Sequence, residues 1–276
     1  MTRETEQWLN TMTLIGYTSK RGNAWHYRAS AQGAEPNHYP NAIPVEDVER
    51  RLFDWLPIEA PLVARYDIGT GNHTDYTVPK HKAILRSDTG DVVGVVGKDY
   101  QVHDYQDWLL RAVEEILQAD ELAIGSAGLL RGGALAWVQV EMEETQSVGG
   151  VEFRPFLTAA TSLDGSMRTT YLTGSQLVVC DNTLTAALVR ADSEDAAFKV
   201  RHSARSLDRL SDVRDALSIV EKAGQRFATD VHSLLDQKIP ETQWRTFADQ
   251  WAGVTDCKDS GNKLAIGKAT KKTQRN

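Results

Sequence analysis

The chain has 276 residues with 41% hydrophobic and 25% charged residues, so it can bury a core and excludes a low-complexity or fibrous protein. Two cysteines, Cys180 and Cys257, exclude a disulfide framework and a CxxC motif. The formal net charge of −7 excludes a surface that is basic throughout, so nucleic-acid binding would need cations gathered in local patches.

The sequence lacks the signals of a membrane or exported protein. No uninterrupted apolar run approaches the ~20 residues that a membrane-spanning helix needs. The N-terminal stretch MTRETEQW is charged and leads into no apolar segment of the signal-peptide type. We therefore expect no membrane contact and a cytoplasmic location.

Residues 1–65 are predicted to form a loop-rich arm, because prolines recur through this stretch. One short helix fits inside the arm. Pro44 suits an early helical position and Pro57 ends the helix. Its apolar face is formed by Val48, Leu52, Phe53 and Trp55.

Residues 66–257 are predicted to form an α+β core domain in which tight turns join the strands. Glycine among polar neighbours indicates these turns, because glycine adopts the positive φ that hairpins need. A helix capped by Asp104 follows the first hairpin. The predicted strands are 81–86 and 92–96, 124–130 and 134–142, and 151–162 and 167–173.

The elements after these strands are predicted to be helical. The stretch 175–189 is ambiguous, but its second half favours a helix. Apolar residues recur with helical period from about Ser206 to Leu235, which predicts a long helix, and Pro240 ends it. Residues 258–276 are polar, basic and aperiodic, which predicts a disordered tail. A short final helix is indicated by Trp244, Phe247 and Trp251.

The order of these elements predicts the fold class. Neighbouring hairpins imply antiparallel pairing, with helices covering one face of the sheet. We therefore expect an α+β fold, in which antiparallel β-hairpins form a curved sheet packed against a long C-terminal helix. No repeat of the solenoid kind is present.

Several strings spread over nearly the whole chain resemble a known family. They are LIGYTSKRGNAWH at 14–26, NHYPNAIPV at 37–45, RLFDW at 51–55, GKDYQVH at 97–103, GS at 165–166 and CDNTL at 180–184. Together they are similar to the phage/plasmid-like proteins of domain-of-unknown-function family 932. The resemblance implies a gene carried by a phage, prophage or plasmid in a bacterial host, without a settled biochemical role. The predicted architecture is also loosely similar to single-strand annealing recombinases, at the level of fold alone.

The segment Tyr17–Arg28 is the first candidate site. Proteins that bind single-stranded DNA need cations for the phosphates and flat rings for the bases, and this segment supplies both without an acidic residue. The alternative is an arm that packs its aromatic rings onto the domain while its cations are solvated. The candidate residues are Lys20, Arg21, Trp25, Tyr27 and Arg28.

A second group of cations lies further along the chain. If the long helix begins before Ser206, then Arg201, Arg205 and Arg209 fall on one face and form a row that suits a phosphate backbone. The alternative is a solvated helix face whose charges pair locally. A hairpin tip adds one more cation. The candidates are Arg168, Lys199, Arg201 and Arg205.

No complete enzyme signature is present. Cys180 follows an apolar run, which favours a small buried residue over a nucleophile, with Asp181 or Asn182 capping the next helix. The seven histidines show no HxH, HExxH or HxxxH spacing, and no glycine-rich string matches a P-loop or Rossmann pattern. We expect no catalytic residue, metal or cofactor. A nuclease, a cysteine hydrolase or a metal site assembled from distant residues is the weakest alternative.

These observations favour a non-catalytic protein that binds, and anneals, single-stranded DNA in phage or plasmid replication or recombination. A homo-oligomer would let a modest positive patch on each subunit add up. The hypothesis requires the scattered cations to converge on one positive groove. The alternative is a protein-binding module that inhibits or redirects a host factor, which suits the acidic net charge. The cations that must converge are Lys20, Arg21, Arg28, Arg201 and Arg205.

Overall fold

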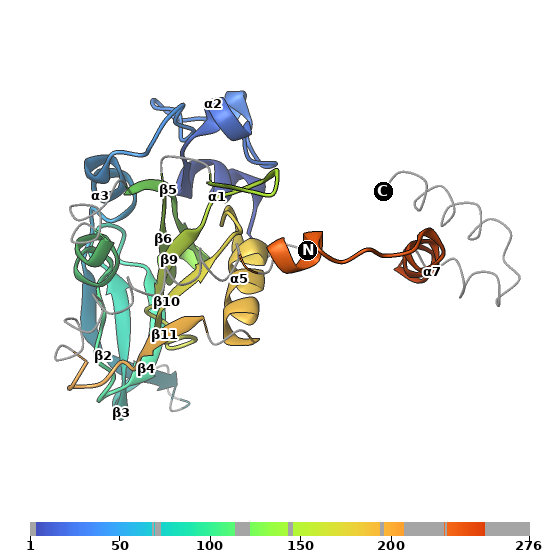
Figure 1. Cartoon of the computed structure of the whole chain (residues 1–276). Helices are drawn as coiled ribbons and strands as arrows, with labels where there is room; N and C mark the ends of the chain where they lie inside the picture. The colour runs from blue at the N-terminus through green and yellow to red at the C-terminus, as the bar shows by residue number, and fades with distance from the viewer. Residues whose placement is uncertain are drawn as a thin grey trace, which may run out of the picture. The chain divides into compact units, whose positions relative to one another are not determined.

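A computed structural model of the chain describes residues 4–67, 69, 73–113, 122–142, 146–193, 196–206, 229 and 231–251. The chain divides into two compact units, Met1–Phe227 and Ala228–Asn276. The first unit contains both of the larger β-sheets (Figure 1).

A six-stranded antiparallel sheet forms the centre of the first unit. Its order is β1-β5-β6-β9-β10-β11, which makes β1 and β11 the two edge strands. The predicted α+β class with antiparallel sheets is therefore confirmed. The bounds are Thr13–Ile15 for β1, Leu122–Leu130 for β5, Leu135–Met142 for β6, Phe156–Ser162 for β9, Thr169–Gly174 for β10 and Ala197–Val200 for β11.

Two turns that the sequence predicted join neighbouring strands of this sheet. Between β5 and β6, the short 3-10 turn η3 (Arg131–Gly133) contains Gly132 and Gly133 at positive φ. Between β9 and β10, Gly165 has a φ of 74°. Glycine occupies these turns because side chains with a Cβ rarely adopt this conformation. The two predicted hairpins are confirmed.

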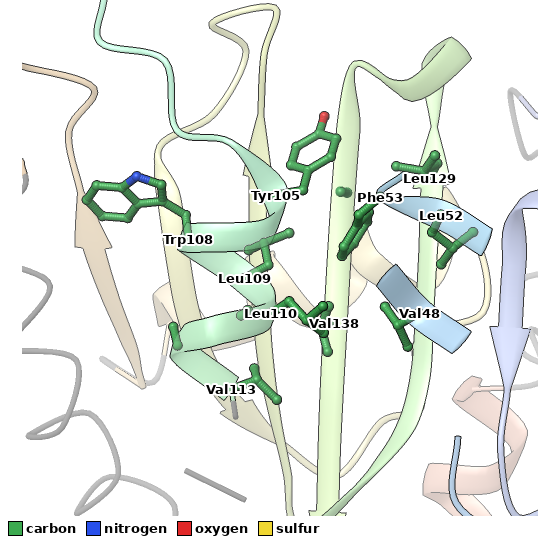
Figure 2. Close-up of a cluster of buried hydrophobic side chains, with 14 of the residues drawn as sticks. Val48, Leu52, Phe53, Tyr105, Trp108, Leu109, Leu110, Val113, Leu129 and Val138 are labelled. Carbon is green, nitrogen blue, oxygen red and sulfur yellow. The ribbon is translucent and has the colours of Figure 1, made fainter. Parts of the chain in front are cut away.

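Apolar clusters cover both faces of the six-stranded sheet. On one face, helix α3 (Val45–Leu52) and the π-helical segment η2 (Gln106–Arg111) pack against strand residues such as Leu129 and Val138 (Figure 2). On the other face, α5 (Asp181–Ser193) packs in a cluster that contains Trp137. Neighbouring residues of a strand point to opposite faces, so Trp137 and Val138 serve different clusters. The expectation that helices cover only one face is wrong.

Helical segments are found at three of the predicted places in the first unit. In α3, Val48 and Leu52 are buried, as is Phe53 directly after it. Asp104 accepts a hydrogen bond from the Asp107 amide at 2.7 Å and so caps the turn that begins η2. The second half of 175–189 forms α5, and Cys180 before it is buried.

A second, three-stranded sheet contributes Ile84 and Val96 to the core cluster that it shares with the first. Its order is β2-β3-β4, with β2 at Pro57–Asp67, β3 at His73–Arg86 and β4 at Val92–Gly97. The sequence predicted β4 and the end of β3 but missed β2. Proline lacks a backbone donor and disfavours a strand interior, but Pro57 and Pro61 are tolerated because β2 is an edge strand.

The other described elements are short. Near the N-terminus these are α1 (Glu6–Met12), α2 (Thr18–Arg21) and the 3-10 turn η1 (Ala29–Ala31). Strands β7 (Gln146–Val148) and β8 (Val151–Phe153) form a separate hairpin.

The predicted long helix Ser206–Leu235 and the predicted tail 258–276 lie largely or wholly outside the described residues. Residues 201–206 are not helical. The predicted final helix is confirmed as α7 (Glu241–Trp251), where the Trp244 and Phe247 rings lie 5.6 Å apart. Among the residues that the structure describes, no helix has the length and apolar character to span a membrane.

Candidate functional site

The six-stranded sheet separates the two groups of candidate residues. Chain segment Tyr17–Arg28 follows β1 and contains the α2 group, defined as Lys20, Arg21, Trp25, Tyr27 and Arg28. Segment 199–205 includes the end of β11 and, together with Arg168, makes up the β11 group, defined as Arg168, Lys199, Arg201 and Arg205.

The two groups do not form one groove. Strands β1 and β11 are the opposite edges of the sheet, five strand spacings apart. At about 4.8 Å per spacing, this separates the edges by about 24 Å. Figure 1 shows α2 at the upper end of the first unit and β11 toward its lower end. The expected convergence of Lys20, Arg21 and Arg28 with Arg201 and Arg205 is therefore wrong, and the hypothesis of one shared DNA-binding groove fails. A DNA-binding surface would have to be formed by one of the two groups alone.

In the α2 group, cations surround the buried ring of Tyr17. Lys20 Nζ lies 5.7 Å from the ring centroid and the guanidinium carbon of Arg21 lies 5.4 Å from it. Arg154, between β8 and β9, contributes a third cation at 5.4 Å. Because aromatic faces attract cations, the ring fixes three positive charges in one place.

A buried carboxylate holds two of these cations. Glu141, near the end of β6, is fully buried and pairs with Arg21 through Oε1 and with Arg154 through Oε2, the latter at 3.4 Å. Gly125 on β5 leaves room for this carboxylate, since a Cβ there would overlap Glu141 Oε1. A buried charge needs such partners because burial removes its hydration.

The side chains of Lys20, Arg21, Glu141 and Arg154 line a cavity of about 510 Å³, which we call the α2 pocket. Of the α2 group, the lining includes Lys20 and Arg21 but not Trp25, Tyr27 or Arg28. The sequence missed the remaining charged lining, which comes from the distant strands of the sheet. It consists of Glu141, Glu152 and Arg154.

The other α2-group residues lie outside the pocket. The Trp25 side chain is 56% exposed. Tyr27 is half-buried and packs on His38, with ring centroids 4.4 Å apart. The Arg28 guanidinium pairs with Glu6 at 2.7 Å. Part of the segment therefore fits the packed-arm alternative.

In the β11 group, two arginines flank the same end of the β10–β11 strand pair. Thr169 on β10 is paired with Val200 on β11, Arg168 precedes the first and Arg201 follows the second. Both arginines are exposed, as is Arg205. Because residues 201–206 are not helical, Arg201 and Arg205 do not form the predicted helical row, and Arg209 lies outside the described residues.

The cations of the β11 group differ in their partners. Lys199 pairs with Asp192 at the end of α5. Within the described part of the chain, no ion pair involves Arg168, Arg201 or Arg205. Three exposed positive charges therefore lie near one end of the sheet without a carboxylate from the described residues.

A stack of four rings fixes the segment that carries Arg201 and Arg205. Tyr100 stacks on His202 at 4.5 Å, His202 on His103 at 4.0 Å, and His103 on Trp108 at 3.6 Å between centroids. His103 also hydrogen bonds through Nε2 to Ser206 Oγ at 2.8 Å. The segment is thus held at both of its ends.

Both stacked histidines are neutral at neutral pH. Burial, and secondarily repulsion by the protonated form of His202, lowers the pKa of His103 to about 3. Burial likewise lowers the pKa of His202. Burial disfavours the charged imidazole, so the stack keeps its neutral form.

The second sheet brings two further lysines to this region. The backbone amide of Gln101 donates to the His202 carbonyl at 3.4 Å, and three residues earlier the Lys98 amide donates to the Lys80 carbonyl at 3.0 Å. Lys80 and Lys98 are exposed, as is Asp99 beside Lys98. We call Lys80, Lys98, Arg168, Arg201 and Arg205 the basic edge. Sequence reasoning missed the two lysines because they belong to the other sheet.

The candidate catalytic groups that the sequence raised are buried in the structure. Ser206 Oγ contacts His103, but both are buried and the other imidazole nitrogen contacts Thr169 Oγ1 at 2.6 Å in place of a carboxylate. Cys180 is buried and its sulfur lies 3.6 Å from Thr183 Oγ1. Among the described residues, no three His, Cys, Asp or Glu side chains are grouped so as to hold a metal.

Comparison with known proteins gives one match. The model of the family described as "Domain of unknown function (DUF932)" matches residues 92–275. No curated protein and no solved structure matches the chain.

Proposed function

The chain belongs to the DUF932 family, a family of unknown function, so its role has to be argued from its own surface. We propose that it binds single-stranded DNA along the basic edge. The binding serves annealing in the replication or recombination of a phage or plasmid. Annealing needs no nucleophile and no metal, only strands held on a surface of cations and rings.

The charge state of the basic edge carries this proposal. Arg168, Arg201 and Arg205 are exposed and have no carboxylate partner among the described residues. By contrast, Arg21 pairs with Glu141 and Arg28 with Glu6 in the α2 group. Like charges at one end of a sheet repel each other, and a phosphate backbone relieves this repulsion while releasing its counterions.

The edge is also pre-organised. The ring stack of His202 and His103 and the hydrogen bond to Ser206 hold residues 201–206 before any ligand arrives. A segment already in its bound conformation loses less entropy on binding. This supports a binding surface rather than a loosely solvated loop.

Rings for base stacking are available on the β2–β3 hairpin. Ala64 pairs with Tyr76, and Tyr66 lies two residues further along β2 on the same face. Tyr66 is 53% exposed and Tyr76 is 63% exposed. The two tyrosines are thus diagonal neighbours on one face of the strand pair, both open to a stacking base. Base stacking on such rings tolerates any sequence.

Binding of a fluorescent thymidine oligonucleotide across a salt series tests the proposal. We expect the dissociation constant to rise with salt, and the combined variant Arg168→Ala, Arg201→Ala, Arg205→Ala to lower the log–log slope by roughly 2, at about 0.7 for each lost phosphate contact. Arg50→Ala is the control, because Arg50 is an exposed arginine of α3 that pairs with Glu35 and Asp47. A folded protein that binds no oligonucleotide at low salt would refute the proposal.

A second candidate function is a protein-binding module for a host factor. The same exposed tyrosines favour it, because aromatic side chains are enriched at the centres of protein interfaces. Capture of a stoichiometric host protein, lost in Tyr66→Ala with Tyr76→Ala and kept in the arginine variant, would favour this function. Loss of oligonucleotide binding in both variants favours the DNA proposal.

A further inference from the structure

The α2 pocket lies at the end of the central strands where Glu141 pairs with Phe156, whereas Arg168 and Arg201 extend from the other end of β10 and β11, so its ligand is a separate question. The turn that leads into the pocket lining is strained at Tyr17, which has φ 54° and ψ 32° in the left-handed region. Bulky side chains rarely adopt this conformation, and such outliers cluster at binding sites. The backbone holds it on both sides: the Tyr17 amide donates to the Asn41 carbonyl at 2.8 Å, and its carbonyl accepts from the Lys20 and Arg21 amides at 3.0 and 3.1 Å.

This strained turn determines where Lys20 and Arg21 lie. The turn begins α2 and places Lys20 and Arg21 in the pocket lining. From the other side of the pocket, Arg154 reaches the same Tyr17 ring. Three cations from two distant parts of the chain thus meet on one buried ring.

Glu141 orients two of these cations, and one carboxylate does not neutralise the positive charge of all three. It engages Arg21 through one oxygen and Arg154 through the other, and it is fully buried. The Arg21 guanidinium carries five donors in a fixed plane, which is more than one oxygen of Glu141 accepts. A planar guanidinium fixed in this way is suited to bidentate recognition of phosphate.

The rest of the lining fits an organic group of limited size. The described lining carries Lys20, Arg21 and Arg154 against Glu141 and Glu152, a positive excess. Its apolar residues include Phe156 and Leu177. A cavity of about 510 Å³ falls within the range of small-molecule sites.

We infer that the α2 pocket binds a phosphate monoester carried on a flat ring, of the size of a mononucleotide. The phosphate lies on Lys20, Arg21 and Arg154, and the ring lies against the apolar lining. Two sources share this chemistry: a free mononucleotide and the 5′-phosphorylated end of a DNA strand.

Calorimetric titration of the full chain tests the site, with thymidine monophosphate, thymidine and inorganic phosphate as probes. We expect the monophosphate to bind most tightly of the three. Lys20→Ala, at an exposed position, and Arg154→Lys, which keeps the charge on Glu141, are each expected to weaken it roughly ten- to a hundredfold, as for a lost charged hydrogen bond. Arg50→Ala is the control that changes the same charge elsewhere.

The two sources are separated with oligonucleotides that do or do not carry a 5′-phosphate, bound to the triple arginine variant of the basic edge. A preference for the phosphorylated strand assigns the pocket to strand ends, and binding of the monophosphate without that preference assigns it to free nucleotides. No response to any phosphate probe, or equal affinity for thymidine and its monophosphate, overturns the inference. Monophosphate binding by a protein that ignores oligonucleotides refutes the DNA proposal and leaves this one standing.

Discussion

The buried carboxylate of Glu141 is stabilised by ion pairs with two cations, Arg21 and Arg154. We predict that Glu141→Gln lowers the free energy of unfolding by about 3 kcal/mol, because breaking a buried ion pair leaves its partners uncompensated. Urea denaturation measures this change. Glu6→Gln is the matched control, since the exposed Glu6–Arg28 pair should contribute no more than about 1 kcal/mol. Equal losses in the two variants would contradict the structural role assigned to Glu141.

His103 makes the folded state sensitive to acid. Its pKa is lowered to about 3 by burial, whereas an unfolded chain titrates near the ordinary value of 6.5. The unfolded state therefore takes up the proton first as the pH falls. The contribution to stability is complete above about pH 6.5 and is lost progressively toward pH 3, with about 2 kcal/mol lost by pH 5.

We therefore predict that His103→Gln flattens the dependence of the unfolding free energy on pH between 6.5 and 4. Urea denaturation at several pH values checks the slope. The exposed His73 supplies the control variant His73→Gln, which should leave the slope unchanged. An unchanged slope in His103→Gln would show that other buried histidines, such as His26 and His38, carry the acid sensitivity.

At the scale of residues, local chemistry was predictable and long-range partners were not. Lys20 and Arg21 meet the Tyr17 ring because the three residues are close in sequence, whereas Trp25, Tyr27 and Arg28 lie outside the pocket. Glu141 lies 120 residues from Arg21, inside a strand that reads as an ordinary alternation, so no local signal marks it as a buried carboxylate. The pairing depends on strand register, which one sequence does not fix.

The elements differ in how much they stabilise the protein. Trp137 on the central strand β6 is fully buried, whereas Tyr66 and Tyr76 on the β2–β3 hairpin are more than half exposed. We predict that Trp137→Ala lowers the free energy of unfolding by about 3–5 kcal/mol, while Tyr66→Ser and Tyr76→Ser each change it by less than about 1 kcal/mol. Thermal unfolding distinguishes these cases. A large loss in either tyrosine variant would mean that the hairpin is covered in solution.

Strands next to glycine turns were predictable, and strands without such turns were not. The β5–β6 and β9–β10 hairpins were predictable from the glycines in their turns, which are Gly132, Gly133 and Gly165. Strand β2 contains two prolines, and β1 and β11 have only three and four residues. Such short edge strands are stabilised by pairing with the neighbouring strand of the sheet and not by their own propensity. Their sequences therefore carry little signal for a strand.

At the scale of the whole molecule, the order of strands decides where charges meet. The prediction of one positive groove relied on cations that are distant in sequence coming together. The sheet instead places β1 and β11 at opposite edges, and it brings Lys98, from the other sheet, toward the region of Arg201. Spatial order was not predictable because β1 pairs with β5, more than a hundred residues away.

This separation makes the two basic regions energetically independent. Substitutions more than about 10 Å apart with no shared partner usually combine additively within about 0.5 kcal/mol. For an oligonucleotide without a 5′-phosphate, we predict that Arg201→Ala weakens binding several-fold and that Lys20→Ala leaves it nearly unchanged. The double variant should bind as the product of the two single effects. Fluorescence anisotropy on the four proteins gives the coupling free energy, and a value well above 0.5 kcal/mol would mean that one strand contacts both edges at once. Binding would then extend across the sheet or between subunits, and the basic edge alone would not account for it.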